Sequence, residues 1–141
     1  MLKTLKKRLG KGEDGFTLIE LLVVVVIIGI LIGIAIPVYL NYRKSANDKA
    51  AQSDLRGAVS TLEVCQSDNA AYPTAITSAG VMTGCAGQTN VQLSSGTSLT
   101  YSVASNQYTM FATNSGGSGK YYCYSSSAGG AVKQATSATV C

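Results

Sequence analysis

The sequence predicts an α+β protein in which one long N-terminal helix, membrane-spanning and then amphipathic, packs on a small antiparallel β-sheet stapled by disulfides. Three patterns predict this class. Residues 16–36 are almost wholly apolar, residues 51–65 repeat apolar side chains at helical spacing, and residues 99–124 alternate with the period of β-strands. Four cysteines lie from residue 65 onward, where disulfides can stabilise a small domain.

The composition excludes most catalytic chemistry. The 141 residues contain no His, so the chain has neither a Ser–His or Cys–His nucleophile pair nor an imidazole metal ligand. The seven acidic residues all precede Asn69, which leaves the second half without carboxylate side chains for acid–base catalysis or calcium binding. We therefore expect no enzyme activity, no cofactor and no metal site.

A basic segment and then an apolar segment open the chain. Residues 1–15 contain five basic and two acidic side chains, and an unbroken run of sixteen apolar or Gly residues extends from Leu21 to Ile36. At helical rise, residues 16–36 span about 30 Å, the thickness of a bilayer core. We expect a single membrane span at residues 16–40. The basic segment favours a cytoplasmic N-terminus, although four basic residues after the span weaken that argument.

Glu20 is the one charged residue between Phe16 and Tyr42. A carboxylate at the centre of a bilayer costs about 2.5–3.5 kcal/mol. Either Glu20 lies at the headgroup boundary, or it has a cationic partner. Cleavage after Gly15 would give Phe16 a free α-amino group four residues before Glu20, and this amine could pair with Glu20 of its own or a neighbouring chain.

The segment 15–21, GFTLIEL, preceded by a basic leader and followed by a long apolar helix with Pro37, resembles the N-terminus of type IV prepilins. The resemblance covers residues 1–65 closely. It implies that prepilin peptidase removes residues 1–15 by cutting between Gly15 and Phe16, and that it N-methylates Phe16. It also implies that Phe16 and Glu20 act in subunit assembly.

Small residues and a proline interrupt the apolar run. Gly29 and Gly33 form a G-x-x-x-G pair, which lipid-embedded helices either merely tolerate or use for close helix–helix approach. Pro37 removes a helical hydrogen-bond donor. In related assembled pili the helix is partly unwound between the positions that match Gly29 and Pro37, so the resemblance implies helix flexibility here.

The rest of the chain, residues 41–141, is expected to form a globular head. One apolar stripe continues the helix from about Tyr39 to Gln66, followed by a loop at residues 67–97. Residues 99–103 and 108–112 each place apolar side chains on one strand face, with Ser105-Asn106 as a tight turn between them. Lys120–Ser125 is a third strand, and the tail after Gly130 adds a short edge strand. The stripe consists of Ala51, Leu55, Ala58, Leu62 and Cys65.

Two disulfides are expected in this head. Ser, Thr and Gly make up 23 of the 52 residues from 90 to 141, so few large side chains remain for a core. Three connectivities are possible. We favour Cys65–Cys85, which would tie the loop to the helix end, with Cys123–Cys141, which would pin the C-terminal tail to the last main strand, as in many pilins.

The resemblance implies a structural subunit of a type IV pilus filament. Its partners would be copies of itself, prepilin peptidase, the inner-membrane assembly machinery and, before assembly, membrane lipid. It would start as a single-pass membrane protein and end in an extracellular filament serving adhesion, motility, DNA uptake or secretion. DNA is a possible partner, but residues 16–141 carry a net charge of only +1, which does not support DNA binding.

Two alternatives to a pilus subunit stay open. One is a pseudopilin of a type II secretion or competence system. Its major form usually has a calcium site near its C-terminal end, and the missing carboxylates argue against that form. The other is a monomeric, membrane-tethered binding module, which would need neither Glu20 nor the Gly15–Phe16 junction.

Overall fold

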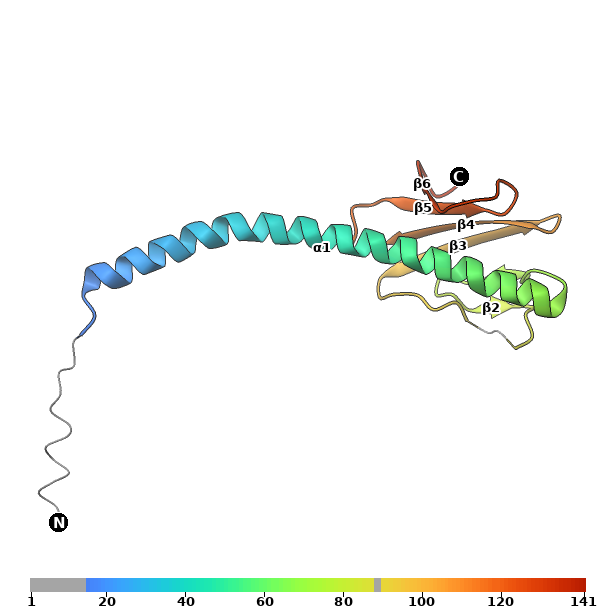
Figure 1. The fold of residues 1–141 in the computed structure, drawn as a ribbon, viewed down its shortest axis with the longest axis horizontal. Helices are drawn as coiled ribbons and strands as arrows, with labels where there is room; N and C mark the ends of the chain where they lie inside the picture. The colour runs from blue at the N-terminus through green and yellow to red at the C-terminus, as the bar shows by residue number, and fades with distance from the viewer. Residues whose placement is uncertain (1–14, 88–89) are drawn as a thin grey trace, which may run out of the picture. The chain divides into compact units, whose positions relative to one another are not determined.

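The computed structural model describes residues 15–87 and 90–141, and within them one helix is followed by six strands (Figure 1). The chain divides into two compact units after Val38, and each is described by itself. Apart from Gly15, the expected leader lies outside the described residues. The elements are α1 Leu18–Asn69, β1 Ala75–Ile76, β2 Met82–Thr83, β3 Thr97–Ala104, β4 Gln107–Asn114, β5 Tyr121–Ser125 and β6 Lys133–Ala135.

The first unit contains the apolar part of α1. Every residue from 15 to 38 is exposed, and this stretch is long and apolar enough to cross a membrane. The helix continues through Pro37. A Cβ built on Gly29 or Gly33 would meet nothing within 4 Å, so neither glycine is required by packing within the chain. Flexibility around these residues therefore stays a prediction.

The second unit contains the rest of α1, which packs against the head. Its predicted stripe is buried: Ala51, Leu55, Ala58, Leu62 and Cys65 all have 0% exposure. The helix ends at Asn69, three residues beyond the expected end, where Ala70 adopts a left-handed φ of 56°. The stripe is therefore the side of the core that α1 contributes.

A four-stranded antiparallel meander in the order β3-β4-β5-β6 supplies the other side of the core (Figure 1). The predicted β3–β4 hairpin is confirmed. Its turn residues Ser105 and Asn106 both have positive φ, 50° and 59°, as a two-residue turn of a twisted hairpin requires. β5 and β6 also form where the alternation and the tail predicted them. Leu99, Tyr108, Met110 and Ala112 face the helix stripe in one buried cluster.

Residues 67–97 are not only a loop, and that part of the prediction is wrong. β1 and β2 pair in a small antiparallel hairpin with Ile76 opposite Met82, and both side chains are buried. A two-residue strand shows no alternation that a sequence pattern can detect. The hairpin lets this segment cover part of the core.

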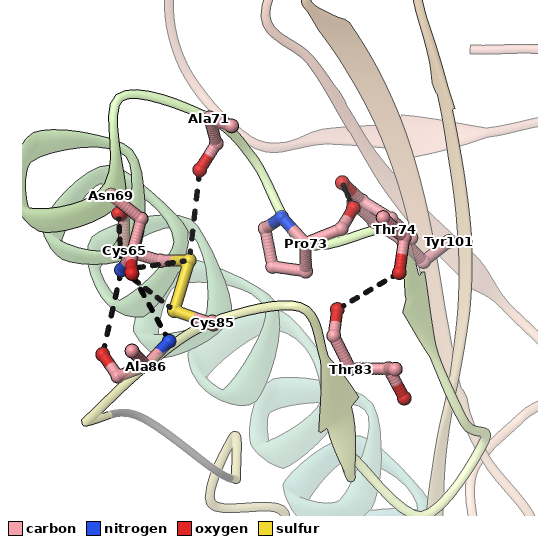
Figure 2. Close-up of a disulfide and its surroundings, with 9 residues drawn as sticks. All are labelled: Cys65, Asn69, Ala71, Pro73, Thr74, Thr83, Cys85, Ala86 and Tyr101. Atoms are coloured by element: carbon pink, nitrogen blue, oxygen red, sulfur yellow. Dashed lines mark hydrogen bonds between the residues drawn. A yellow bond between two sulfur atoms is a disulfide. The ribbon is translucent and has the colours of Figure 1, made fainter.

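Two disulfides link the head. Cys65 is bonded to Cys85 with a Cα–Cα distance of 5.7 Å, and Cys123 is bonded to Cys141 with a Cα–Cα distance of 5.5 Å. Figure 2 shows that Asn69 lies beside the first bond: its side-chain amide donates to the Cys65 carbonyl at 3.0 Å, and its Oδ1 accepts from the Ala86 amide at 3.1 Å. The last turn of α1 and the β1–β2 segment are therefore joined twice.

Tyrosines fill the junction between the end of α1 and the sheet. The buried Tyr108 ring lies edge-on to Tyr72 and stacked on Tyr124, with ring centroids 4.7 and 5.7 Å apart. Its hydroxyl donates to Glu63 Oε1 at 2.7 Å. Burial raises the pKa of Tyr108 well above its usual range, and the bond to Glu63 adds to this. The Tyr101 hydroxyl donates to the Pro73 carbonyl at 2.8 Å.

Asp48 fixes the β4–β5 loop to α1. Its side chain is 5% exposed and accepts from the Ser118 amide at 2.9 Å and the Ser118 hydroxyl at 2.5 Å. Next to it, the side-chain amide of Asn47 donates to the Gly116 carbonyl at 2.9 Å. A Cβ on Gly117 would collide with Asp48 Oδ1, so the loop needs glycine to approach this closely. We call these contacts the Asp48 clamp.

We predict that Asp48→Ala lowers the free energy of unfolding by about 1–3 kcal/mol, because it removes the buried carboxylate that accepts both hydrogen bonds from Ser118. Urea unfolding of the processed subunit in detergent measures the change. Asp68→Ala is the matched control, since Asp68 is an exposed carboxylate on the same helix. Equal stability of both variants and the parent chain would contradict the role given to the clamp.

We also predict an alkaline loss of stability. Burial, with a contribution from Tyr72, raises the pKa of Tyr101 to about 12 from its ordinary value of 10.0. The unfolded chain therefore releases this proton before the folded head does, and the stabilisation present below pH 10 is lost as the pH rises towards 12. Tyr101→Phe should flatten this decline in unfolding experiments, whereas Tyr42→Phe, at a 74% exposed position, should not. An unchanged slope in Tyr101→Phe would refute the assignment.

Candidate processing and assembly site

The expected cleavage site lies in an open stretch of backbone. Gly15, Phe16 and Thr17 precede the first residue of α1 and have no regular structure, and Phe16 is 83% exposed. A peptide bond inside a helix has its amide and carbonyl paired along the helix, whereas the bond between Gly15 and Phe16 is outside it. This bond is therefore accessible without unwinding α1.

Thr17 and Glu20 form a capping box at the start of α1. The Thr17 amide and hydroxyl donate to Glu20 Oε2 at 2.8 and 2.7 Å, and the Glu20 amide donates back to Thr17 Oγ1 at 3.3 Å. The first amides of a helix have no partner within the helix, and this reciprocal pair satisfies two of them. A carboxylate in the first turn also interacts favourably with the positive end of the helix dipole.

The box gives Glu20 a role that the sequence argument missed. Neither headgroup contact nor pairing with an amine is needed to orient its carboxylate, because Thr17 of the same chain does so. The signal was present as T-x-x-E spacing directly before an apolar run. Both bonds converge on Oε2, so Oε1 keeps the capacity to accept a bond from another donor.

Cleavage after Gly15 would change the charge at this helix start. The new α-amino group would lie one residue before Thr17, close to the positive end of the dipole, where a cation is disfavoured unless an anion compensates it. Glu20 is the nearest carboxylate in sequence on the helix side. Phe16 and Glu20 therefore both lie at the N-terminal end of α1. A pairing between the amine of Phe16 and the carboxylate of Glu20 stays a prediction.

No group of three His, Cys, Asp or Glu side chains comes together within residues 15–87 and 90–141. No residues of this part are therefore assigned to a metal ion. The chemistry of the site consists of one accessible peptide bond and one oriented carboxylate.

Comparison with known proteins supports the resemblance. Residues 10–36 match the family model of the prokaryotic N-terminal methylation motif. The chain is also 40% identical over 113 residues to the type IV wide pilus major component PilA4 of Thermus thermophilus, in a match that covers 76% of this chain and 78% of that protein. The chain belongs to the type IV pilin family.

This pilin also resembles secretion proteins over a shorter range. It is 39% identical to the type II secretion system core protein G of Pseudomonas aeruginosa over 63 residues, and 39% identical to that of Vibrio cholerae over 64 residues. Each match covers 45% of this chain and 44% of the secretion protein. No solved structure gives a significant match.

We predict that Thr17→Val loosens the first turn of α1, because it removes both the hydroxyl acceptor and one donor of the capping box. Loss of such a cap costs about 0.5–2 kcal/mol, so the amides of residues 18–21 should exchange with deuterium several-fold faster. Thr17→Ser keeps the hydroxyl and is the control. Identical exchange in Thr17→Val and the parent pilin would show that the box does not hold the helix start.

Proposed function

We propose that this pilin is a structural subunit of a type IV pilus filament. Prepilin peptidase cuts the accessible bond between Gly15 and Phe16 and N-methylates Phe16. The subunit first spans the membrane once through its apolar helix, and it then joins copies of itself in an extracellular filament. The single observation that supports this most strongly is the match to a pilus major component over most of the chain.

The exposure of α1 supplies the physical reason for assembly. Large apolar side chains at residues 16–38 are 47–83% exposed. Burial of apolar surface is favourable by about 25 cal/mol per Å², so this stretch is stable only when something apolar covers it. Lipid covers it before assembly. When the assembly machinery of the inner membrane withdraws the helix from lipid, helices of other copies take over that role.

Glu20 would then specify how the helices align. In a bundle of apolar helices an unpaired carboxylate costs several kcal/mol, whereas a carboxylate paired with an amine and hydrogen-bonded to Thr17 is compensated. The methylated amine of Phe16 from a neighbouring subunit is a cation that cleavage creates. Pairing with Glu20 Oε1 would favour one axial offset of neighbouring helices over slipped ones.

A pseudopilin of a type II secretion system is the second candidate. The matches to core protein G of several secretion systems favour it, although they cover less than half of each chain. Sheared surface material distinguishes the two candidates. A pilus subunit forms long surface filaments at its native level, and a secretion pseudopilin is required instead for release of secreted enzymes.

We predict that Glu20→Gln and Glu20→Ala reduce filament yield at least tenfold while the subunit is still cut before Phe16. Gln keeps the shape and accepts from Thr17, but it loses the charge that an amine partner needs. Sheared filaments and processed subunit in membranes are quantified for each strain, and the mature N-terminus is sequenced. Asp68→Asn removes the same charge at an exposed position of the head and should leave the yield unchanged.

Normal filament yield in Glu20→Gln would show that the charge is dispensable. A mature chain that begins at Met1 would show that the bond between Gly15 and Phe16 is not processed. Either outcome would overturn the proposed mechanism. The first would contradict the role of Glu20 in assembly, and the second would contradict the processing step.

A further inference from the structure

A cluster of aromatic and basic side chains begins the second unit. Tyr39 and Tyr42 are 65% and 74% exposed, and Arg43 and Lys44 directly after them are exposed as well. Residues three and four apart share a face of a helix, so Tyr39, Tyr42 and Arg43 lie along one face of α1. We call residues 39, 42, 43 and 44 the YYRK cluster.

The two tyrosines of the cluster differ from those of the core. Tyr72, Tyr101 and Tyr108 direct their hydroxyls to Glu63 or Pro73 within the head. Tyr39 and Tyr42 instead present most of their rings to the surroundings. Exposed Tyr with an apolar ring and a polar hydroxyl is typical of the boundary between lipid tails and headgroups.

The acidic residues that follow hydrogen-bond to serines and not to the cations of the cluster. Asp48, the next carboxylate in sequence, is buried in the Asp48 clamp and uses both oxygens for Ser118. Asp54 likewise accepts from the amide and hydroxyl of Ser94, at 2.8 and 2.9 Å. The clamp also holds the β4–β5 loop against α1 (Figure 1). Lys120, the last residue of this loop, is a further exposed cation. This end of the head therefore has an excess of positive side chains, with Arg43, Lys44, Lys49 and Lys120 against the single carboxylate of Asp48.

The position of the cluster matches the thickness of a membrane. Tyr39 and Tyr42 lie 19 and 22 residues after Glu20. At helical rise this separation is about 28–33 Å, and a bilayer core is about 30 Å thick. When the Glu20 carboxylate is at one boundary, the YYRK cluster is at the other.

We propose that the YYRK cluster is an interfacial site for anionic phospholipid headgroups. The tyrosine rings lie at the tail–headgroup boundary, the Arg43 guanidinium binds two phosphate oxygens with its planar fork, and Lys44 adds a point charge. The site serves the subunit before assembly, so it rests on the proposed function. It fixes the depth of the helix in the membrane and must be released when the subunit is extracted.

A lipid fits the cluster better than a nucleic acid. A duplex that binds through its backbone needs many phosphate contacts over a wide basic face. The YYRK cluster has two cations on about one and a half helical turns, directly after an apolar span. This is enough for one or two headgroups.

The test uses the processed full chain in nanodiscs of phosphatidylcholine mixed equally with phosphatidylglycerol. The protein is then extracted from the nanodiscs into detergent and purified, and the phospholipids that stay bound to it are counted by mass spectrometry. Hydrogen exchange of residues 39–47 is followed in the intact nanodiscs. The parent pilin should retain phosphatidylglycerol preferentially. Arg43→Gln/Lys44→Gln should lower this preference roughly tenfold or more, since each basic residue near an anionic surface contributes measurably to binding.

Arg56→Gln/Lys133→Gln is the matched control, because it removes two exposed cations elsewhere on the head. It should keep the lipid preference, and urea unfolding shows whether each variant is folded. Equal loss in both double variants, or no preference in the parent chain, would overturn the site. A preference of the parent chain for double-stranded DNA, lost in Arg43→Gln/Lys44→Gln without a change in lipid retention, would assign the cluster to nucleic acid instead.

The lipid test does not depend on assembly. Nanodiscs contain single processed subunits, so a failure of Glu20→Gln to affect filaments leaves the lipid preference unchanged. Conversely, loss of the lipid preference leaves the pairing of Phe16 with Glu20 untouched. Tyr39→Ala/Tyr42→Ala should raise hydrogen exchange over residues 39–47 while keeping the preference for phosphatidylglycerol, which separates ring insertion from phosphate binding.

Discussion

Burial of the apolar side chains of α1 is the constraint from which the rest of the structure follows. In the head, the stripe from Ala51 to Cys65 is covered by the meander and by the β1–β2 hairpin. Residues 15–38 have no cover from their own unit and are exposed throughout. The hydrophobic effect acts equally on both parts of the helix. The sheet covers the apolar side chains of the second part, so those of the first part need lipid or other copies of the chain to cover them.

Three carboxylates of the chain fix local structure through hydrogen bonds. Glu20 caps the helix through Thr17, Asp48 holds the β4–β5 loop through Ser118, and Glu63 anchors Tyr108. Each accepts from a neutral donor, so none of these carboxylates uses a basic side chain as its hydrogen-bond partner. These hydrogen bonds therefore stabilise the fold without using Arg43 or Lys44 as donors.

Sequence patterns predicted the parts of the fold that depend on repetition. The helix stripe and the β3–β4 hairpin with Ser105-Asn106 were predicted because period and turn chemistry persist over many residues. The β1–β2 hairpin was not, since two paired residues on each strand have no period. The burial of Asp48 depends on Ser118, which is 70 residues away, and no local pattern encodes it. At the site, the motif around Gly15 and Glu20 was visible, whereas its T-x-x-E spacing was overlooked.

The central claim is that copies of this pilin cover the helix stretch that the chain itself leaves exposed. Photo-crosslinking tests it most directly: a photoreactive amino acid at Ile27, which is 52% exposed, is irradiated in membranes and in sheared filaments. We predict lipid adducts in membranes and subunit–subunit adducts in filaments, with the second site on residues 16–38 of another copy. Filaments in which Ile27 yields no adduct to another subunit would contradict it.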